Sequence, residues 1–191
     1  MNIKDVNEPT LRDWSEIFEL QARLNEMFEP GYFEKCKNFD ISYHEDQEFF
    51  KHYCWCITEE LTEAIEAVEL KEPTHIKEEL IDALNFTMQL YGLYGWSYDD
   101  VKDSQVPDQI DMNIAILDAV YSLGLTANCL KNRVWRESQY LVDLYVFEPR
   151  LKAIWGKMIA IFRTQGIQDE DIRKLWDLKH QVNIFRIESK Y

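Results

Sequence analysis

The chain has 191 residues, a net charge of −14 and 46% hydrophobic residues, a composition that predicts a folded domain with a sizeable apolar core. So large a negative charge argues against binding nucleic acid through bulk electrostatics and is typical of a protein that binds cations. The N-terminus has no apolar signal segment and no run of 18 apolar residues occurs, so we expect neither secretion nor a membrane span. The four cysteines form no C-x-x-C pair, which favours reduced thiols in the cytoplasm.

The spacing of apolar residues and the scarcity of glycine and proline predict an all-α fold. Residues 31–45 are expected to be irregular, and Pro149 to kink or split the fifth helix. The polar segment 95–111 is the expected linker. We predict a rigid catalytic core of residues 1–94 and 166–191, with a four-helix metal-binding site, and a helical insertion or mobile subdomain of residues 95–165. The expected helices cover residues 11–28, 48–70, 74–94, 112–128, 140–165 and 169–185.

Two neighbouring helices each carry carboxylates three residues apart, Glu60 with Glu63 and Glu79 with Asp82. The second pair lies in "KEELIDALNF", a segment that is apolar on nearly every side and therefore expected to be buried. The short connection "KEPTH" predicts antiparallel helices, so the two pairs can face each other. Four facing carboxylates repel unless divalent cations neutralise them, and Mg²⁺ prefers such oxygen ligands. The ordinary alternative, that each pair lies on a solvated face, is not excluded by spacing alone.

The acidic chain ends in a basic segment, "KHQVNIFRIESKY". Lys179, Asn183 and Arg186 recur at helical spacing, and Tyr191 follows. Arg offers a fork of donors to a phosphate and Lys offers a point charge, although a solvated terminus is the ordinary interpretation. We expect this segment to become ordered, or to close, over a bound polyphosphate. The carboxylate pairs could bind a metal, and the cationic side chains could bind phosphate. Together they predict metal-assisted phosphoryl chemistry.

These motifs resemble the all-α nucleoside triphosphate pyrophosphatases, and most closely the dimeric type 2 dUTPases and the phage dCTP/dUTP pyrophosphatases. The resemblance lies in "ELQARLNEMF", "EELTEAIE", "KEELIDALNF" and "GIQDEDIRKLWDLKHQVNIFRIESKY". It covers roughly residues 16–94 and 166–191. Type 2 dUTPases often carry a Trp- and Lys-rich segment between the acidic helices, where this chain has only "LKEPTHIK". The basic segment "LKNRVWR" is expected to supply equivalent groups.

The resemblance implies that Glu60, Glu63, Glu79 and Asp82 bind two or three Mg²⁺ ions per site, with Mn²⁺ as a substitute. Glu60 and Glu63 are the alternatives for the general base. Gln21 and Asn25 are expected at the nucleotide, since each amide offers both a donor and an acceptor to a base. Trp55 either stacks on the base or packs in the core. The expected substrate contacts are Gln21, Asn25, Trp55, Asn85, Lys131, Arg133, Trp135, Arg136, Lys179, Asn183, Arg186 and Tyr191.

The sequence thus predicts an Mg²⁺-dependent hydrolase that converts a pyrimidine deoxynucleoside triphosphate, dUTP first and dCTP second, to the monophosphate and pyrophosphate. The expected reaction is attack of a metal-activated water on the α-phosphorus. The alternatives are a related pyrophosphatase for a purine or modified nucleotide, and a catalytically inactive acidic helical binding module. We expect a homodimer with a small-molecule nucleotide substrate and with neither nucleic acid nor membrane as a partner. Its expected location is the cytoplasm, that of the host if the chain is phage-encoded.

Overall fold

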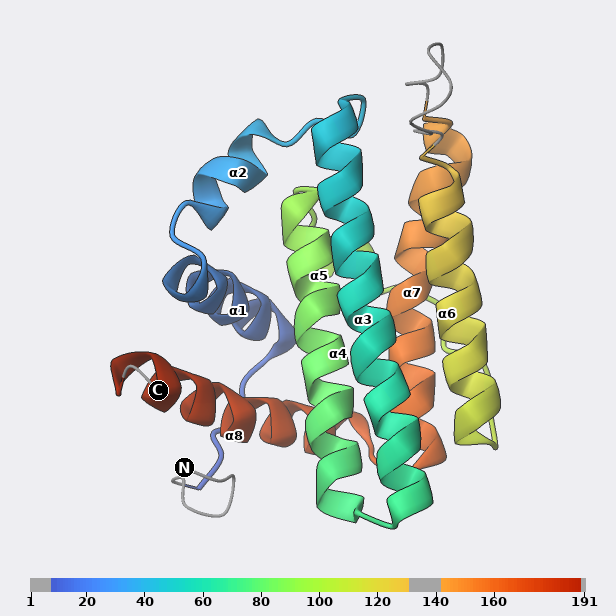
Figure 1. The fold of residues 1–191 in the computed structure, drawn as a ribbon. Helices are drawn as coiled ribbons and strands as arrows, with labels where there is room; N and C mark the ends of the chain where they lie inside the picture. Colours follow the sequence, from blue (N-terminus) through green and yellow to red (C-terminus); the bar gives the residue numbers. More distant parts are fainter. Residues whose placement is uncertain (1–7, 131–141, 190–191) are drawn as a thin grey trace.

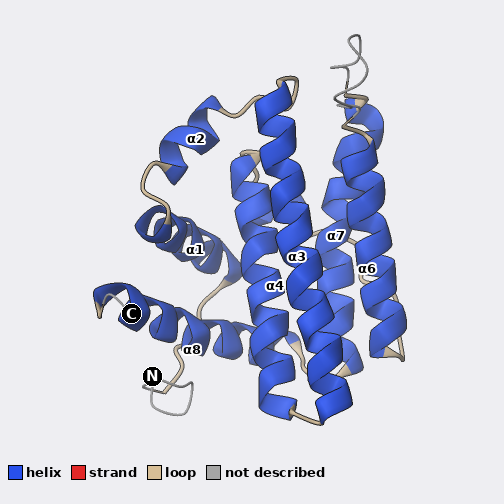
Figure 2. Ribbon diagram, viewed as in Figure 1, coloured by secondary structure: helices blue, strands red, loops and turns tan. Residues whose placement is uncertain are grey.

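The structure, a computed structural model, describes residues 8–130 and 142–189 (Figure 1). In these residues every regular element is a helix and no strand occurs (Figure 2), which confirms the predicted all-α fold. No helix among them is both long and apolar enough to cross a membrane. The helices are α1 (Trp14–Phe28), α2 (Tyr32–Asn38), α3 (His44–Leu70), α4 (Pro73–Leu93), α5 (Tyr98–Val101), α6 (Met112–Asn128), α7 (Leu144–Thr164) and α8 (Asp169–Glu188).

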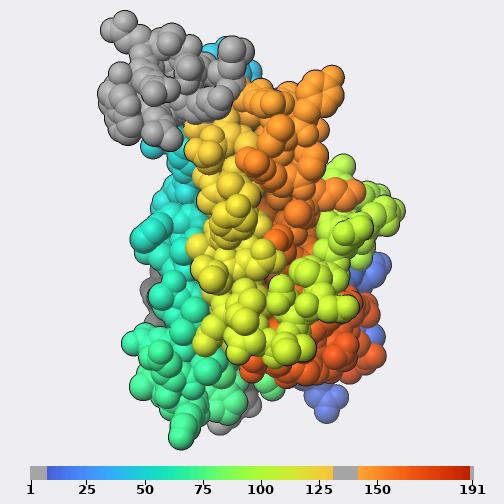
Figure 3. Space-filling model, turned by 90° about the vertical axis from the view of Figure 1, so that its right-hand side faces the viewer, coloured from blue at the N-terminus to red at the C-terminus, as the bar shows by residue number. Residues whose placement is uncertain are grey.

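Four long helices form a bundle that consists of two hairpins. The α3–α4 hairpin lies beside the α6–α7 pair (Figure 1), and α6 fills the side of the molecule between α3 and α7 (Figure 3). On the opposite side, α1 and α8 pack against α4, and α8 runs across the bundle direction (Figure 1). Helix α4 therefore has neighbours on both sides, which agrees with the apolar residues on nearly every side of its sequence.

The central position of α4 explains why it is apolar around most of its circumference. Leu80 and Leu84 are fully buried, and so is Tyr91, whose hydroxyl donates to the backbone carbonyl of Leu151 in α7. Polar side chains on this helix are also removed from solvent, since Glu79 is only 7% exposed. A carboxylate in that position needs a partner, because burial disfavours its charged form.

A tight turn sets the register of α3 against α4. Lys71 adopts a left-handed conformation with φ of 60°, and the backbone N–H groups of Lys71 and Glu72 donate to the carbonyls of Val68 and Ala67. Pro73 then occupies the first turn of α4. Its fixed φ suits a helix there, and a backbone N–H at this position would have no hydrogen-bond partner within the helix. Helices joined by so short a turn run antiparallel, which confirms the prediction from "KEPTH".

The structure differs from the sequence-based expectations at α5, which lies within the expected linker 95–111, and in two further places. Residues 32–38 form α2 rather than an irregular segment, anchored by Tyr32, whose hydroxyl donates to the backbone carbonyl of Gln89. Helix α7 continues through Pro149 without a split. The proline lies in the second helical turn and frees only the carbonyl of Tyr145, a residue that is 95% exposed. Water can therefore satisfy that carbonyl.

The apolar core is continuous across the expected boundary between the two parts of the chain. One cluster of buried side chains joins Leu61 and Leu84 of the α3–α4 hairpin to Ala119 of α6 and Ile154 of α7. Residues 95–165 thus share a core with the rest of the described chain. Whether this segment moves as a separate subdomain stays a prediction.

The segment before α1 is fixed to α8 by Asp177, a carboxylate that is only 2% exposed. It accepts hydrogen bonds from the backbone N–H of Thr10 at 2.9 Å, from Nε of Arg12 at 2.8 Å and from the side chain of Gln181 at 2.9 Å. Burial alone raises the pKa of Asp177, but these hydrogen bonds and the Arg12 charge together bring it below its ordinary value. The ionised carboxylate therefore stabilises the folded chain.

Replacing Asp177 with Asn should lower the free energy of unfolding by about 2–3 kcal/mol at neutral pH, because charged hydrogen bonds at a buried site are lost. The folded-state pKa lies below the unfolded-state value of 3.8. The contribution is thus fully present above about pH 4 and is lost as the pH falls through the folded-state pKa. Urea denaturation of both proteins from pH 7 to pH 3.5 should show the difference shrinking at the acid end. Asp171→Asn, at an exposed site on the same helix, should change stability little; an equal loss there would contradict the assignment.

Candidate metal centre

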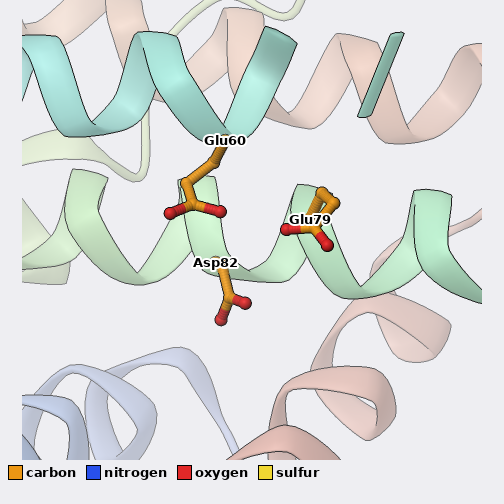
Figure 4. Close-up of side chains that lie close together, drawn as sticks. All are labelled: Glu60, Glu79 and Asp82. Carbon is orange, nitrogen blue, oxygen red and sulfur yellow. The ribbon is translucent and has the colours of Figure 1, made fainter. Parts of the chain in front are cut away.

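Three carboxylates from the α3–α4 hairpin converge on one point. Glu60 of α3 and Glu79 and Asp82 of α4 each offer one oxygen, and these oxygens all lie within 4.8 Å of one another (Figure 4). The i, i+3 spacing on α4 places Glu79 and Asp82 on one side of that helix, and the Glu60 side chain extends from α3 toward them (Figure 4). The facing arrangement expected from the sequence is therefore formed by three of the four predicted carboxylates.

Burial and the close approach of these groups disfavour the charged forms of Glu60 and Asp82. Burial raises the pKa of Glu60, and its hydrogen bond with Glu79 and the negative charges of Asp82, Glu79 and Glu63 raise it further. Burial also raises the pKa of Asp82, although the charges of Lys179 and Arg186 oppose this rise. The ionised form of the cluster therefore requires positive charge nearby.

Two basic side chains lie against the cluster from outside the acidic motifs. The ammonium group of Lys179 in α8 forms an ion pair with Asp82. His75, in the first turn of α4, places Nε2 2.5 Å from Glu79 and Nδ1 3.1 Å from Glu72. Sequence analysis assigned Lys179 to phosphate and missed His75. The i, i+4 spacing of His75 and Glu79 was the available signal.

The donor set fits a hard divalent cation. All three converging ligands are carboxylate oxygens, which Mg²⁺, Mn²⁺ and Ca²⁺ prefer over softer metals. Asn85, one turn beyond Asp82, is 9% exposed, and its Oδ1 is buried without a hydrogen-bond partner among the described residues. Its Nδ2 lies 3.4 Å from Asp82 Oδ1. A buried, unpaired acceptor beside an anionic cluster suits a site that receives a cation or a hydrated ligand.

The other residues expected on α3 lie at the surface. Glu63 is exposed and does not belong to the cluster, although it lies one turn beyond Glu60. Trp55 is 60% exposed, so it is not a core residue and its ring is available for contact. Neither position contradicts a role toward a bound nucleotide, and both assignments stay predictions.

The C-terminal residues are part of the folded structure. Lys179 and Asn183 are only 7% and 8% exposed, and α8 continues to Glu188 against α1 and α4. Arg186 is exposed in the last turn and its charge acts on Asp82. The buried face of α8 already packs on the core, so ordering does not depend on substrate in α8, whereas closure of this helix over a triphosphate stays a prediction. Lys131, Arg133, Trp135, Arg136 and Tyr191 lie outside the described residues.

Gln21 and Asn25 form a hydrogen-bonded pair on α1. Nε2 of Gln21 donates to Oδ1 of Asn25 at 2.9 Å, and Nε1 of Trp176 in α8 donates to Oε1 of Gln21 at 3.2 Å. Each of the two amides is 4% exposed. The sequence motif that contains Trp176 was recognised, but the contact of this residue with α1 was not.

A family model described as dUTPase matches residues 13–191 of this chain. The chain belongs to the type 2 dUTPase family. The match spans the acidic hairpin, residues 95–165 and α8, and so includes every described residue of the candidate centre. The all-helical fold agrees with this family, as the resemblance implied. Comparison with curated proteins and with solved structures found no match.

Binding of Mg²⁺ to the cluster should stabilise this dUTPase family member against heat, because the cation relieves repulsion that exists only in the folded state. At a concentration 100 times its dissociation constant, a folded-state ligand stabilises by about 2.7 kcal/mol. Thermal melting in EDTA and in rising Mg²⁺ should show this increase for the wild type. Asp82→Asn should lose most of it, whereas Glu69→Gln, at an exposed site on α3, should keep it. Equal Mg²⁺ stabilisation of all three proteins would contradict the assignment.

Proposed function

We propose that this protein hydrolyses dUTP to dUMP and pyrophosphate with Mg²⁺ as its cofactor. The observation that carries the proposal is the cluster of Glu60, Glu79 and Asp82 across the α3–α4 hairpin, in a chain that belongs to the dUTPase family. When bound there, Mg²⁺ would neutralise phosphate charge and lower the pKa of the attacking water. Two or three ions per site, and Mn²⁺ as a substitute, remain part of the proposal.

The side chains around the cluster have distinct tasks in this reaction. Glu60 takes a proton from water, the water oxygen attacks the α-phosphorus, and the bond from that phosphorus to the bridging oxygen breaks as pyrophosphate leaves. We prefer Glu60 to Glu63 for this role because Glu60 belongs to the cluster and Glu63 is exposed. Lys179 and Arg186 are cations on the Asp82 side of the cluster and would bind phosphate oxygens.

The alternative functions differ in whether they use this cluster. Hydrolysis of dCTP, or of a purine or modified nucleotide, would use the same carboxylates and differ only in base contacts. An inactive acidic binding module would have no need for three carboxylates at mutual distances within 4.8 Å, an arrangement that disfavours their charge. The substrate profile separates these possibilities. A homodimer located in the cytoplasm stays a prediction, and light scattering of the purified protein tests the dimer.

Pyrophosphate release from all deoxynucleoside triphosphates, with Mg²⁺ and with EDTA, tests the proposed function. We expect dUTP to be the best substrate and EDTA to abolish its hydrolysis. Glu60→Gln and Asp82→Asn should each lower kcat/KM by about 100-fold or more, because a general base or a metal ligand is removed. Glu66→Gln, exposed on α3, is the matched control and should retain full activity.

Comparison of Glu60→Gln with Glu63→Gln distinguishes the two candidates for the base. If Glu60 is the base, its variant should lose kcat at saturating Mg²⁺, while the Glu63 variant should change mainly the Mg²⁺ concentration needed for activity. The opposite pattern would assign the proton transfer to Glu63. Hydrolysis of dUTP that proceeds equally well in EDTA would reject the metal-dependent mechanism itself.

A further inference from the structure

Helix α6 is apolar on two sides, but the described residues cover only one of them. It packs against α3 and α7, and its buried inner side includes Ala115, Ile116, Ala119 and Leu123. Its outer side faces the viewer in Figure 3 (yellow), and no described helix covers it. Helix α4, which is also apolar on nearly every side, has neighbours on both of its sides, as such a helix normally does. Helix α6 lacks the second neighbour.

Three large apolar side chains lie in line on the outer side of α6. Ile114 is 57% exposed, Leu117 68% and Tyr121 60%, and their spacing of three and four residues places them on one face of the helix. Ile110, just before the helix, is 99% exposed. Apolar residues at alternating intervals of three and four are the pattern of helices that pack against another helix in a coiled coil. A single exposed leucine is ordinary, whereas a line of four large apolar side chains marks an interaction surface.

Gly124 continues the same line, three residues beyond Tyr121, and is also exposed. A glycine inside a helix lowers the stability of that helix relative to alanine. Neither of the usual intramolecular reasons for a glycine applies here. Gly124 does not have a positive φ, and a Cβ at this position would meet no described atom within 4 Å outside the backbone of its own helix. Close approach of a second helix, from outside the chain, is the remaining reason.

The exposed line on α6 carries no charge, although charged residues make up 29% of the chain. Between residues 109 and 130 the only charged side chains are Asp111 and Asp118. Asp111 caps the helix by accepting from the backbone N–H of Ile114 at 2.9 Å, and Asp118 pairs with Lys157 of α7 at 2.6 Å. A partner with a strongly basic or acidic surface would therefore find no complementary charge here. The chemistry of this surface requires an apolar partner.

We propose that two copies of this chain associate through the outer side of α6, with the two α6 helices packed antiparallel about a two-fold axis. The contact is formed by the α6 seam, which we define as Ile110, Ile114, Leu117, Tyr121 and Gly124. Leu117 lies at the middle of the seam, seven residues from Ile110 and seven from Gly124. A two-fold axis at Leu117 therefore overlaps the whole seam with its copy. It places the large side chain of Ile110 against the partner's Gly124, where no side chain takes up space.

The symmetry of the seam about Leu117 is the reason to choose a second copy as the partner. Contact about a two-fold axis uses the same surface on both subunits, so each apolar side chain of the seam is buried twice in the dimer. Four large side chains with these exposed fractions present several hundred Å² of surface. A stable interface buries about 800 Å² on each partner, so the seam supplies a large part of that area. No residue of the seam belongs to the carboxylate cluster, and this inference does not rest on the proposed hydrolysis.

Sedimentation equilibrium of the purified protein over a range of concentrations measures the dissociation constant of the dimer. Leu117→Glu places two carboxylates at the two-fold axis and should raise that constant by about 100-fold or more. Phe28→Glu is the matched control, because Phe28 is 56% exposed at the end of α1, which lies across the bundle from α6 (Figure 1). It should change the constant by less than about threefold. A wild type that stays monomeric at about 100 μM, or an equal loss in both variants, overturns the proposal.

Gly124→Gln gives an independent answer, including the case in which Leu117→Glu fails to fold. In a single chain the new side chain enters open space and favours the helix, so circular dichroism should show an unchanged helix content. In the dimer the same side chain separates the two helices, and the dissociation constant should rise by about tenfold or more. A dimer as tight in this variant as in the wild type overturns the proposal.

The salt dependence of the wild-type dimer tests the apolar character of the contact. Two copies that each carry a net charge of −14 repel, and the seam has no ion pair to lose. Raising the NaCl concentration from about 50 mM to about 500 mM should therefore lower the dissociation constant, because the repulsion is screened. A dimer that dissociates more readily at high salt is held by charge and contradicts the seam. Sedimentation is measured without nucleotide, so this result is independent of whether the protein hydrolyses dUTP.

Discussion

Three carboxylates held within 4.8 Å of one another across a helical hairpin are the constraint on which the rest of the structure depends. Like charges at this separation, with one group only 7% exposed, oppose folding unless a cation or a proton intervenes. The opposing free energy has to come from the core around α4. That core is correspondingly large: α4 is covered by α3 on one side and by α1 and α8 on the other. Burial of the apolar residues of α4 thus holds the acidic groups in place.

Helix α8 has a second task beyond covering α4. It brings the ammonium group of Lys179 to Asp82 from 97 positions away in the sequence, so part of the charge on the cluster is balanced by the fold itself. The same helix is fixed to the segment before α1 through Asp177 and Arg12. Because both contacts belong to one rigid helix, the position of Lys179 is set by interactions remote from the metal centre. Lys179 therefore provides a positive charge beside Asp82 as part of the folded helix.

Features that depend on residues close together in the sequence could be predicted, whereas contacts between distant residues could not. Helical periodicity is local, so the helices and the pairs on α3 and α4 could be found from the sequence, and a short turn made their approach predictable. Glu63 shows the limit of this reasoning, because spacing identifies neighbours on a helix but not which of them faces the partner. Asp177 and Trp176 were missed as structural anchors, since their partners lie more than 150 positions away and no pattern within α8 identifies them. His75 was missed because its i, i+4 spacing to Glu79 is common to many pairs on exposed helix faces and does not by itself indicate a metal centre.

Trp176 and Lys179 lie three residues apart on α8 and join it to two different helices. The indole N–H of Trp176 donates to Gln21 on α1, and the ammonium group of Lys179 forms an ion pair with Asp82 on α4. A cation that binds at the cluster competes with Lys179 for Asp82, so the ammonium group becomes available to a phosphate oxygen. The hydrogen bond to α1 and the ion pair to the carboxylate cluster therefore both come from one turn of α8, so the position of this helix fixes both contacts.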